Sequence, residues 1–125
     1  MYRRQLDAWL RTFPRGQVHV IQMEEMQDHE EATLNTLKEF LGMNVTVPAW
    51  EIRNVNSRHA KRGQPMTRHE YEHLVEIARA DAKQVARVLD QYGAGDGDAF
   101  VARWEQVWQG VLDECEGDQC YVDSN

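Results

Sequence analysis

The sequence of 125 residues contains no long apolar run and only two cysteines. A helix that crosses a bilayer needs about 20 predominantly apolar residues, and the first residues, MYRRQL, lack the apolar centre of a signal peptide. We therefore expect no membrane segment in this chain. Its share of hydrophobic residues, 42%, is close to that of globular proteins and excludes wholesale disorder. The length corresponds to one domain.

The two cysteines, Cys115 and Cys120, lie five positions apart near the carboxyl end. Two ligands alone make a poor zinc site, so the spacing favours ordinary thiols. A small disulfide loop is the alternative if the compartment is oxidising. The sequon that begins at Asn44 has meaning only if the chain is lumenal.

Acidic residues outnumber basic ones, and the formal net charge of −7 argues against nucleic acid as a partner. The stretch from Ile52 to His69 is different, because it has no acidic residue and contains Arg53, Arg58, Lys61, Arg62 and Arg68. Arginine offers bidentate donors, lysine a compact charge, and Gly63 lets backbone amides approach an anion closely. The stretch therefore predicts a binding site for phosphate or sulfate groups, with a solvated basic loop as the alternative.

Hydrophobic spacing and turn residues predict a mostly helical chain with one or two strands. Asp28 is expected to cap the second helix and Gly42 to end it. The inner face of the third helix is predicted to carry Leu74, Ile77, Ala78, Val85, Val88, Leu89 and Tyr92. Phe100, Trp104 and Trp108 lie at helical spacing on one side of the fourth helix. We assign these aromatic residues to packing. The expected elements are a helix over 2–13, a strand over 17–23, a helix over 28–41, a basic loop over 43–66, helices over 68–92 and 98–112, and a loose tail over 113–125.

Residues 69–73, HEYEH, fit the H-E-x-x-H pattern of zinc peptidases. Thr67, however, stands three residues before Glu70, which is the capping box of a helix amino terminus, and Met66 and Tyr71 occupy the positions of a hydrophobic staple. We therefore interpret the motif as a helix start and assign no metal ligand and no catalytic residue to it. A zinc peptidase is the less favoured alternative.

The order of segments resembles the carboxyl-terminal half of the carbohydrate-type, heparan-sulfate-like sulfotransferases. The resemblance is carried by YRRQLDAWLRTFPRGQVHVIQMEEM, then HEEATLNTLKEFLGM, then a basic loop that leads into GQPMTRHEYEHLVEIARADAKQVARVLDQYG. It covers residues 2 to about 93. In this family a helix that ends in a Phe-Pro turn leads to a strand with an acidic end, a helix ending in Phe-Leu-Gly, and a basic loop before a Pro-Met-initiated helix.

The resemblance implies a P-loop-like α/β fold, with residues 18–23 as one strand of a central parallel sheet. It implies the sulfuryl donor 3′-phosphoadenosine 5′-phosphosulfate (PAPS) and an acceptor with a hydroxyl or amine group, expected to be a carbohydrate. By position, Lys61, Arg62 and Gly63, with Arg58 nearby, match the family's loop that contacts the nucleotide phosphates. The Golgi lumen is the favoured compartment, and the cytoplasm is the alternative.

The family's loop for the 5′-phosphosulfate and its catalytic base have no counterpart in these residues. The chain alone is therefore expected to be an inactive carboxyl-terminal portion of such an enzyme. A noncatalytic helical module that binds an anion or an acidic partner through the basic loop is the alternative function.

Overall fold

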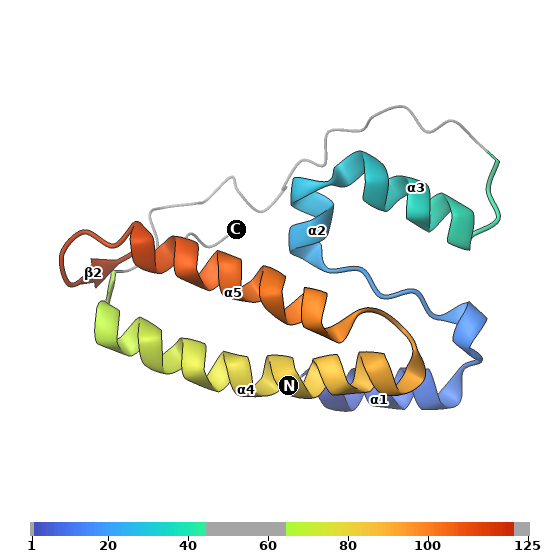
Figure 1. Cartoon of the computed structure of the whole chain (residues 1–125), viewed down its shortest axis with the longest axis horizontal. Coiled ribbons are helices and arrows are strands. Elements are labelled where there is room, and N and C mark those ends of the chain that lie inside the picture. The colour runs from blue at the N-terminus through green and yellow to red at the C-terminus, as the bar shows by residue number, and fades with distance from the viewer. Residues whose placement is uncertain (1, 45–64, 122–125) are drawn as a thin grey trace.

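A long helical hairpin dominates the computed structural model, which describes residues 2–44 and 65–121 (Figure 1). Its first arm is α4 (Arg68–Tyr92), and its second is α5 (Gly97–Asp113), which runs back along α4. Gly93 ends α4 in the left-handed conformation, with φ 59°, as its position after the last helical residue predicted. Asp96 then caps α5 by accepting a hydrogen bond from the backbone N–H of Ala99 at 3.0 Å.

The main core lies along α4, where α1 (Tyr2–Thr12) and α5 both pack against it. Leu10 of α1 is buried, and so are the residues on the facing part of α4, which are Ala82, Val85, Ala86, Val88 and Leu89. The hydroxyl of Tyr92 donates to Asp7 at 3.1 Å, and Arg15 donates to the backbone carbonyl of Gly93. These contacts hold the amino-terminal helix against the turn of the hairpin.

A disulfide between Cys115 and Cys120 closes the far end of the hairpin. It shapes residues 115–120 into a loop whose strand β2 (Gln119–Cys120) pairs antiparallel with β1 (Met66–Thr67). Cys120 is fully buried in a small cluster with Tyr71 and Val75. The prediction of ordinary thiols in a loose tail is therefore wrong for residues 113–121, and the disulfide alternative is correct.

The structure differs from the strand predicted over 17–23. A short 3-10 turn, η1 (Arg15–Gln17), occupies its beginning, and a helix, α2 (Met23–Asp28), its end. Between them the chain is extended, but it has no neighbouring strand within the described residues, so no ladder forms. The physical reason is that β-branched residues favour an extended backbone, whereas a strand also needs hydrogen-bonding partners.

The helix predicted over 28–41 begins differently. Asp28 is the last residue of α2 rather than a cap, and α3 (Glu30–Phe40) starts after His29. Gly42 has the predicted left-handed conformation, with φ 64°. The helix over 2–13 is confirmed as α1, which ends one residue earlier. The helix over 68–92 is confirmed as α4, and that over 98–112 as α5 with one more residue at each end.

The predicted inner face of α4 is wrong in its first half. Leu74 and Ile77 are 49% and 58% exposed, whereas Tyr71 and Val75 are buried. The buried row of α4 continues at alternating spacings of four and three residues through Tyr71, Val75, Ala78, Ala82, Val85 and Leu89, with Ala78 only partly buried. The prediction chose Leu74 and Ile77, whereas Tyr71 and Val75 are the residues that pack with Cys120 of the disulfide loop and with apolar residues of α5.

The described residues are thus mostly helical, with a two-stranded antiparallel sheet. The P-loop-like α/β fold with a parallel sheet stays a prediction. No helix within 2–44 or 65–121 has the length and hydropathy needed to cross a membrane.

Candidate functional site

The start of α4 is fixed by two reciprocal bonds between Thr67 and Glu70. The backbone N–H of Glu70 donates to the hydroxyl of Thr67 at 3.2 Å, and the backbone N–H of Thr67 donates to the carboxylate of Glu70 at 2.8 Å. Two hydrogen bonds to its carboxylate lower the pKa of Glu70. The larger effect comes from the backbone N–H of Thr67 and the smaller from the hydroxyl of Thr67. The capping box predicted from the sequence is confirmed, and Glu70 has a structural role.

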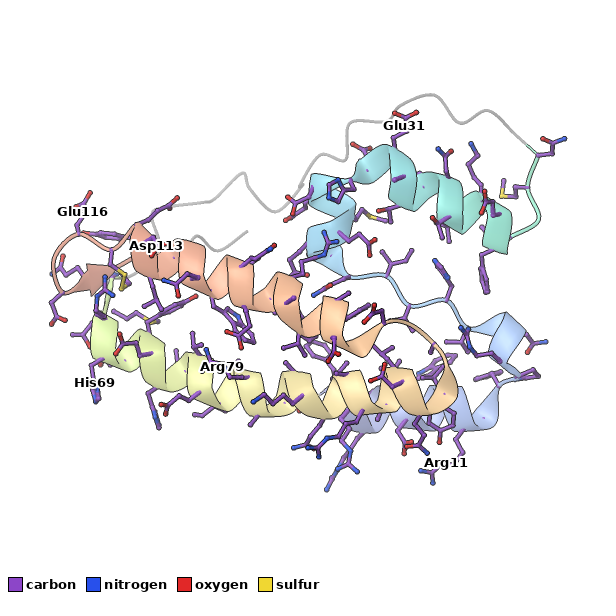
Figure 2. The ribbon with its side chains drawn as sticks, in the orientation of Figure 1. Arg11, Glu31, His69, Arg79, Asp113 and Glu116 are labelled. Carbon is purple, nitrogen blue, oxygen red and sulfur yellow. A yellow bond between two sulfur atoms is a disulfide. The ribbon has the colours of Figure 1, made fainter. Side chains whose placement is uncertain are left out.

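The two histidines of the HEYEH motif are exposed on α4. Figure 2 shows His69 projecting from α4 on the side away from α5. His73 is 68% exposed at its side chain and lies 3.8 Å from the carboxylate of Glu76. Over residues 2–44 and 65–121, no three His, Cys, Asp or Glu side chains gather closely enough to hold a metal ion. The geometry therefore gives no support to a zinc peptidase.

The end of the basic stretch is anchored by Arg68. Its backbone N–H donates to the carbonyl of Asp118 at 2.9 Å, and its guanidinium donates to the carbonyl of Leu112 at 2.8 Å. Arg68 therefore binds the carboxyl end of α5 and the disulfide loop. The other predicted cofactor-binding residues, Arg58, Lys61, Arg62 and Gly63, fall within 45–64, outside the described residues.

A groove of about 690 Å³ lies beside the hairpin, a volume within the range of ligand sites. Four segments line it: α1, residues 20–24, the middle of α4 and the first half of α5. We call it the tryptophan groove. Its lining residues are Tyr2, Gln5, Leu6, Trp9, Val20, Ile21, Gln22, Met23, Glu24, Ala78, Asp81, Ala82, Val85, Phe100, Trp104 and Trp108.

Aromatic rings of α5 form one wall of this groove. Phe100 meets Trp104 edge to face at 5.9 Å between centroids, and Trp104 lies nearly parallel to Trp108 at 6.5 Å. The indole N–H of Trp104 donates to the carboxylate of Glu24 at 3.1 Å, which ties α5 to α2. Ala78 and Ala82 of α4 also line the groove, and their small side chains take up little of its volume.

A second, smaller hollow of about 270 Å³ lies beside residues 19–22, between α3 and the start of α5. His19 stacks on Phe40 of α3 there, with ring centroids 4.9 Å apart. Arg103 lines the hollow, and its guanidinium lies 4.0 Å from the carboxylate of Asp28. Two acidic residues, Glu25 and Asp96, also line the hollow. This mixture of charges gives no anion site.

The sequence-based prediction assigned the aromatic residues of the fourth helix to packing and did not include a groove. Phe100, Trp104 and Trp108 are partly buried, whereas Trp9 and Met23, on other segments of the lining, are 57% and 72% exposed. The i, i+4, i+8 spacing of Phe100, Trp104 and Trp108 was the available signal, but it does not distinguish a buried face from the wall of an open groove.

Comparison with known proteins gives a partial similarity. A segment of 56 residues, 44% of the chain, is 38% identical to the membrane-associated sulfotransferase kil1 of Dictyostelium discoideum. The match spans 12% of that protein, so the chain corresponds to a small part of it. No family model matches the chain, and no solved structure matches it. The chain is therefore similar, over less than half of its length, to part of a sulfotransferase.

Proposed function

We propose that this chain is part of a sulfotransferase that transfers a sulfuryl group from PAPS to a hydroxyl or amine acceptor. The observation that supports it is the 38% identity over 56 residues with a protein named as a membrane-associated sulfotransferase. The segment order that resembles carbohydrate-type sulfotransferases agrees with this similarity. A carbohydrate is the acceptor class that the resemblance favours.

In this proposal Lys61, Arg62 and Gly63, with Arg58, hold the phosphates of the nucleotide. The donor set fits the group, because guanidinium and ammonium groups form charge-assisted hydrogen bonds to phosphate and glycine permits close backbone approach. PAPS, when bound, supplies the sulfuryl group. The contribution of these residues is to position the nucleotide and to stabilise negative charge on it, and none of them is assigned the role of a base.

The disulfide supports an oxidising compartment for this function. Cys115 and Cys120 form a disulfide. Structural disulfides persist in secretory compartments and are rare in the cytosol. The Golgi lumen is therefore preferred to the cytoplasm in this proposal. The word "membrane-associated" in the name of the relative is compatible with that location.

The test is equilibrium binding of 3′-phosphoadenosine 5′-phosphate to the complete chain by calorimetry. We expect the double variant Lys61→Ala/Arg62→Ala to bind at least about tenfold more weakly. The reason is that a hydrogen bond to a charged group contributes about 1.5–3 kcal/mol, and 1.4 kcal/mol corresponds to tenfold. The matched control is Lys83→Ala/Arg87→Ala, which removes the same charge from the exposed face of α4.

Two results would overturn the proposal. One is wild-type affinity in the Lys61→Ala/Arg62→Ala variant. The other is an equal loss of affinity in the Lys83→Ala/Arg87→Ala control. Equal competition by inorganic sulfate and by the nucleotide would assign the loop to a noncatalytic anion-binding module instead.

A further inference from the structure

The disulfide loop, residues 115–120, buries little of itself. Residues 116–119 are exposed, and Cys120 is the one fully buried residue of the loop. Its turn is closed by two backbone hydrogen bonds between Glu116 and Gln119, at 2.8 and 3.1 Å. A segment with a single buried side chain belongs to the low end of local stability, so the loop depends on its covalent bond.

The same loop holds the residues that lead into α4. Strand β2 pairs with β1 over two residues on each strand. The backbone N–H of Arg68 donates to the carbonyl of Asp118, inside the loop, at 2.9 Å. Its guanidinium donates to the carbonyl of Leu112, before the loop, at 2.8 Å. An isolated pair of such short strands is marginal in water, so this pairing lasts only while the loop is held in place.

The packing of the loop depends on Cys120. This residue contacts Tyr71 and Val75 of α4, and Met66 of β1 is partly buried in the same cluster. The disulfide ties Cys120 to Cys115, which follows the carboxyl end of α5. One covalent bond therefore joins the end of α5 to β2 and, through β2, to the residues that begin α4.

We propose that the Cys115–Cys120 pair is an oxidation-dependent switch for residues 66–68, the junction at which α4 begins. With the disulfide formed, the junction is held against the loop. With both cysteines reduced, the loop opens and β1 separates from β2. The capping box of α4 lies within Thr67 and Glu70, so the helix itself persists in both states.

The oxidant is itself a disulfide, of the class of glutathione disulfide. Cys115 is only partly buried, so its thiolate attacks one sulfur of the oxidant and releases a first thiolate. The thiolate of Cys120 then attacks the Sγ of Cys115 in the mixed disulfide and releases a second. The two cysteines lose two electrons and two protons, and the oxidant becomes two thiols. A dithiol reverses these steps and is oxidised to its own disulfide.

The junction is also where the basic stretch ends, since Arg68 is the last basic residue of that stretch. Oxidation therefore fixes the carboxyl end of the stretch in a compartment that supplies a disulfide oxidant, and this agrees with the oxidising compartment proposed above. The switch uses only residues within 65–121. It stands independently of the proposed sulfotransferase function.

Native-state hydrogen exchange of the complete chain, in low concentrations of urea, tests the switch before and after reduction by dithiothreitol. The amides of Arg68 and Gln119 report on the junction, and that of the fully buried Leu89 reports on global unfolding. After reduction, Arg68 and Gln119 should exchange at least about tenfold faster, because the disulfide no longer restricts the open loop. Their exchange should not depend on urea, since local opening exposes little surface, whereas exchange at Leu89 should rise with urea.

Two further measurements separate the switch from a general loss of stability. In the reduced chain, iodoacetamide should modify Cys120 at a rate within about tenfold of that of Cys115, because the open loop exposes both thiols. Glutathione disulfide should restore slow exchange at Arg68 in the reduced chain. Cys115→Ala/Cys120→Ala is the matched control, in which exchange at Arg68 should be fast and should not respond to the oxidant.

Three results would overturn the proposal. The first is exchange at Arg68 that does not change on reduction. The second is exchange at Arg68 that matches Leu89 in rate and in urea dependence, which would limit the disulfide to a contribution to global stability. The third is slow modification of Cys120 in the reduced chain, which would show that β2 stays packed without the bond.

Discussion

Arg79 of α4 and Glu105 of α5 form a two-point ion pair across the helical hairpin. The Nε–H of Arg79 donates to one carboxylate oxygen of Glu105 at 2.5 Å, and its Nη2 donates to the other at 2.8 Å. Figure 2 labels Arg79 on the stretch of α4 that runs beside α5. The hydrogen bonds from Arg79 lower the pKa of Glu105, and its positive charge adds to the effect.

Glu105→Gln should therefore destabilise the protein more at pH 7 than at pH 3. A carboxylate whose pKa is lower in the folded state contributes stability above its unfolded pKa, about 4.3, and loses that contribution as the pH falls through the folded pKa. The effect should be small, because the two side chains are 39% and 35% exposed and solvent screens the pair. Urea denaturation at both pH values measures it, with Glu72→Gln as the control at an exposed position of α4. An equal loss at pH 3 would show that the effect is not electrostatic.

Two glycines of α5 should respond to alanine in opposite directions. A Cβ atom at Gly97 would lie 2.6 Å from the carbonyl oxygen of Ala86 and 2.8 Å from the carboxylate of Asp90, so Gly97→Ala should lower the free energy of unfolding by about 1–3 kcal/mol. Gly110 has no atom within 4 Å of that position, so Gly110→Ala should raise the free energy by up to about 1 kcal/mol. Urea titration of both variants measures this, and stabilisation by Gly97→Ala would contradict the close contact of α4 and α5.

Alanine variants of two leucines of α4, compared by urea titration, test which face of this helix is buried. Leu89 is fully buried, and Leu89→Ala should lower the free energy of unfolding by about 2–5 kcal/mol. Leu74 is 49% exposed, and Leu74→Ala should change it by less than about 1 kcal/mol. Similar losses for the two variants would mean that the predicted face, with Leu74 inside, is the correct one.

Reduction of the disulfide should lower the free energy of unfolding by about 2 kcal/mol, the loss of chain-entropy stabilisation for a loop this short. The comparison is urea denaturation with and without a thiol reductant. Cys115→Ala/Cys120→Ala is the control, since a reductant should leave this variant unchanged. Sensitivity of the control to reductant would point to a different cause.

The helical part of the fold could be predicted where local residues specify it. Thr67 and Glu70 fix the start of α4 and Gly93 fixes its end, and all three act through their own neighbours in the sequence. The inner face of α4 could not be predicted in the same way. It depends on where α5 and the disulfide loop pack, and these contacts select Tyr71 and Val75 over Leu74 and Ile77.

The site was predicted less well than the helices. The basic stretch was visible as a local excess of charge, whereas the tryptophan groove combines residues from four segments, with Trp9 and Trp108 almost a hundred positions apart. The extended segment shows the same limit: Val18 and Val20 indicate an extended backbone, but whether a strand lies beside them is a property of other parts of the fold.

The α4–α5 hairpin is closed at both ends, by the turn over residues 93–96 at one and by the paired strands and the disulfide at the other. Its contacts join neighbouring elements of the sequence, whereas α1 reaches α4 through residues as distant as Asp7 and Tyr92. Local contacts form fastest, so the hairpin should act as the folding nucleus on which α1 assembles afterwards. Denaturant should therefore release α1 before the two long helices separate.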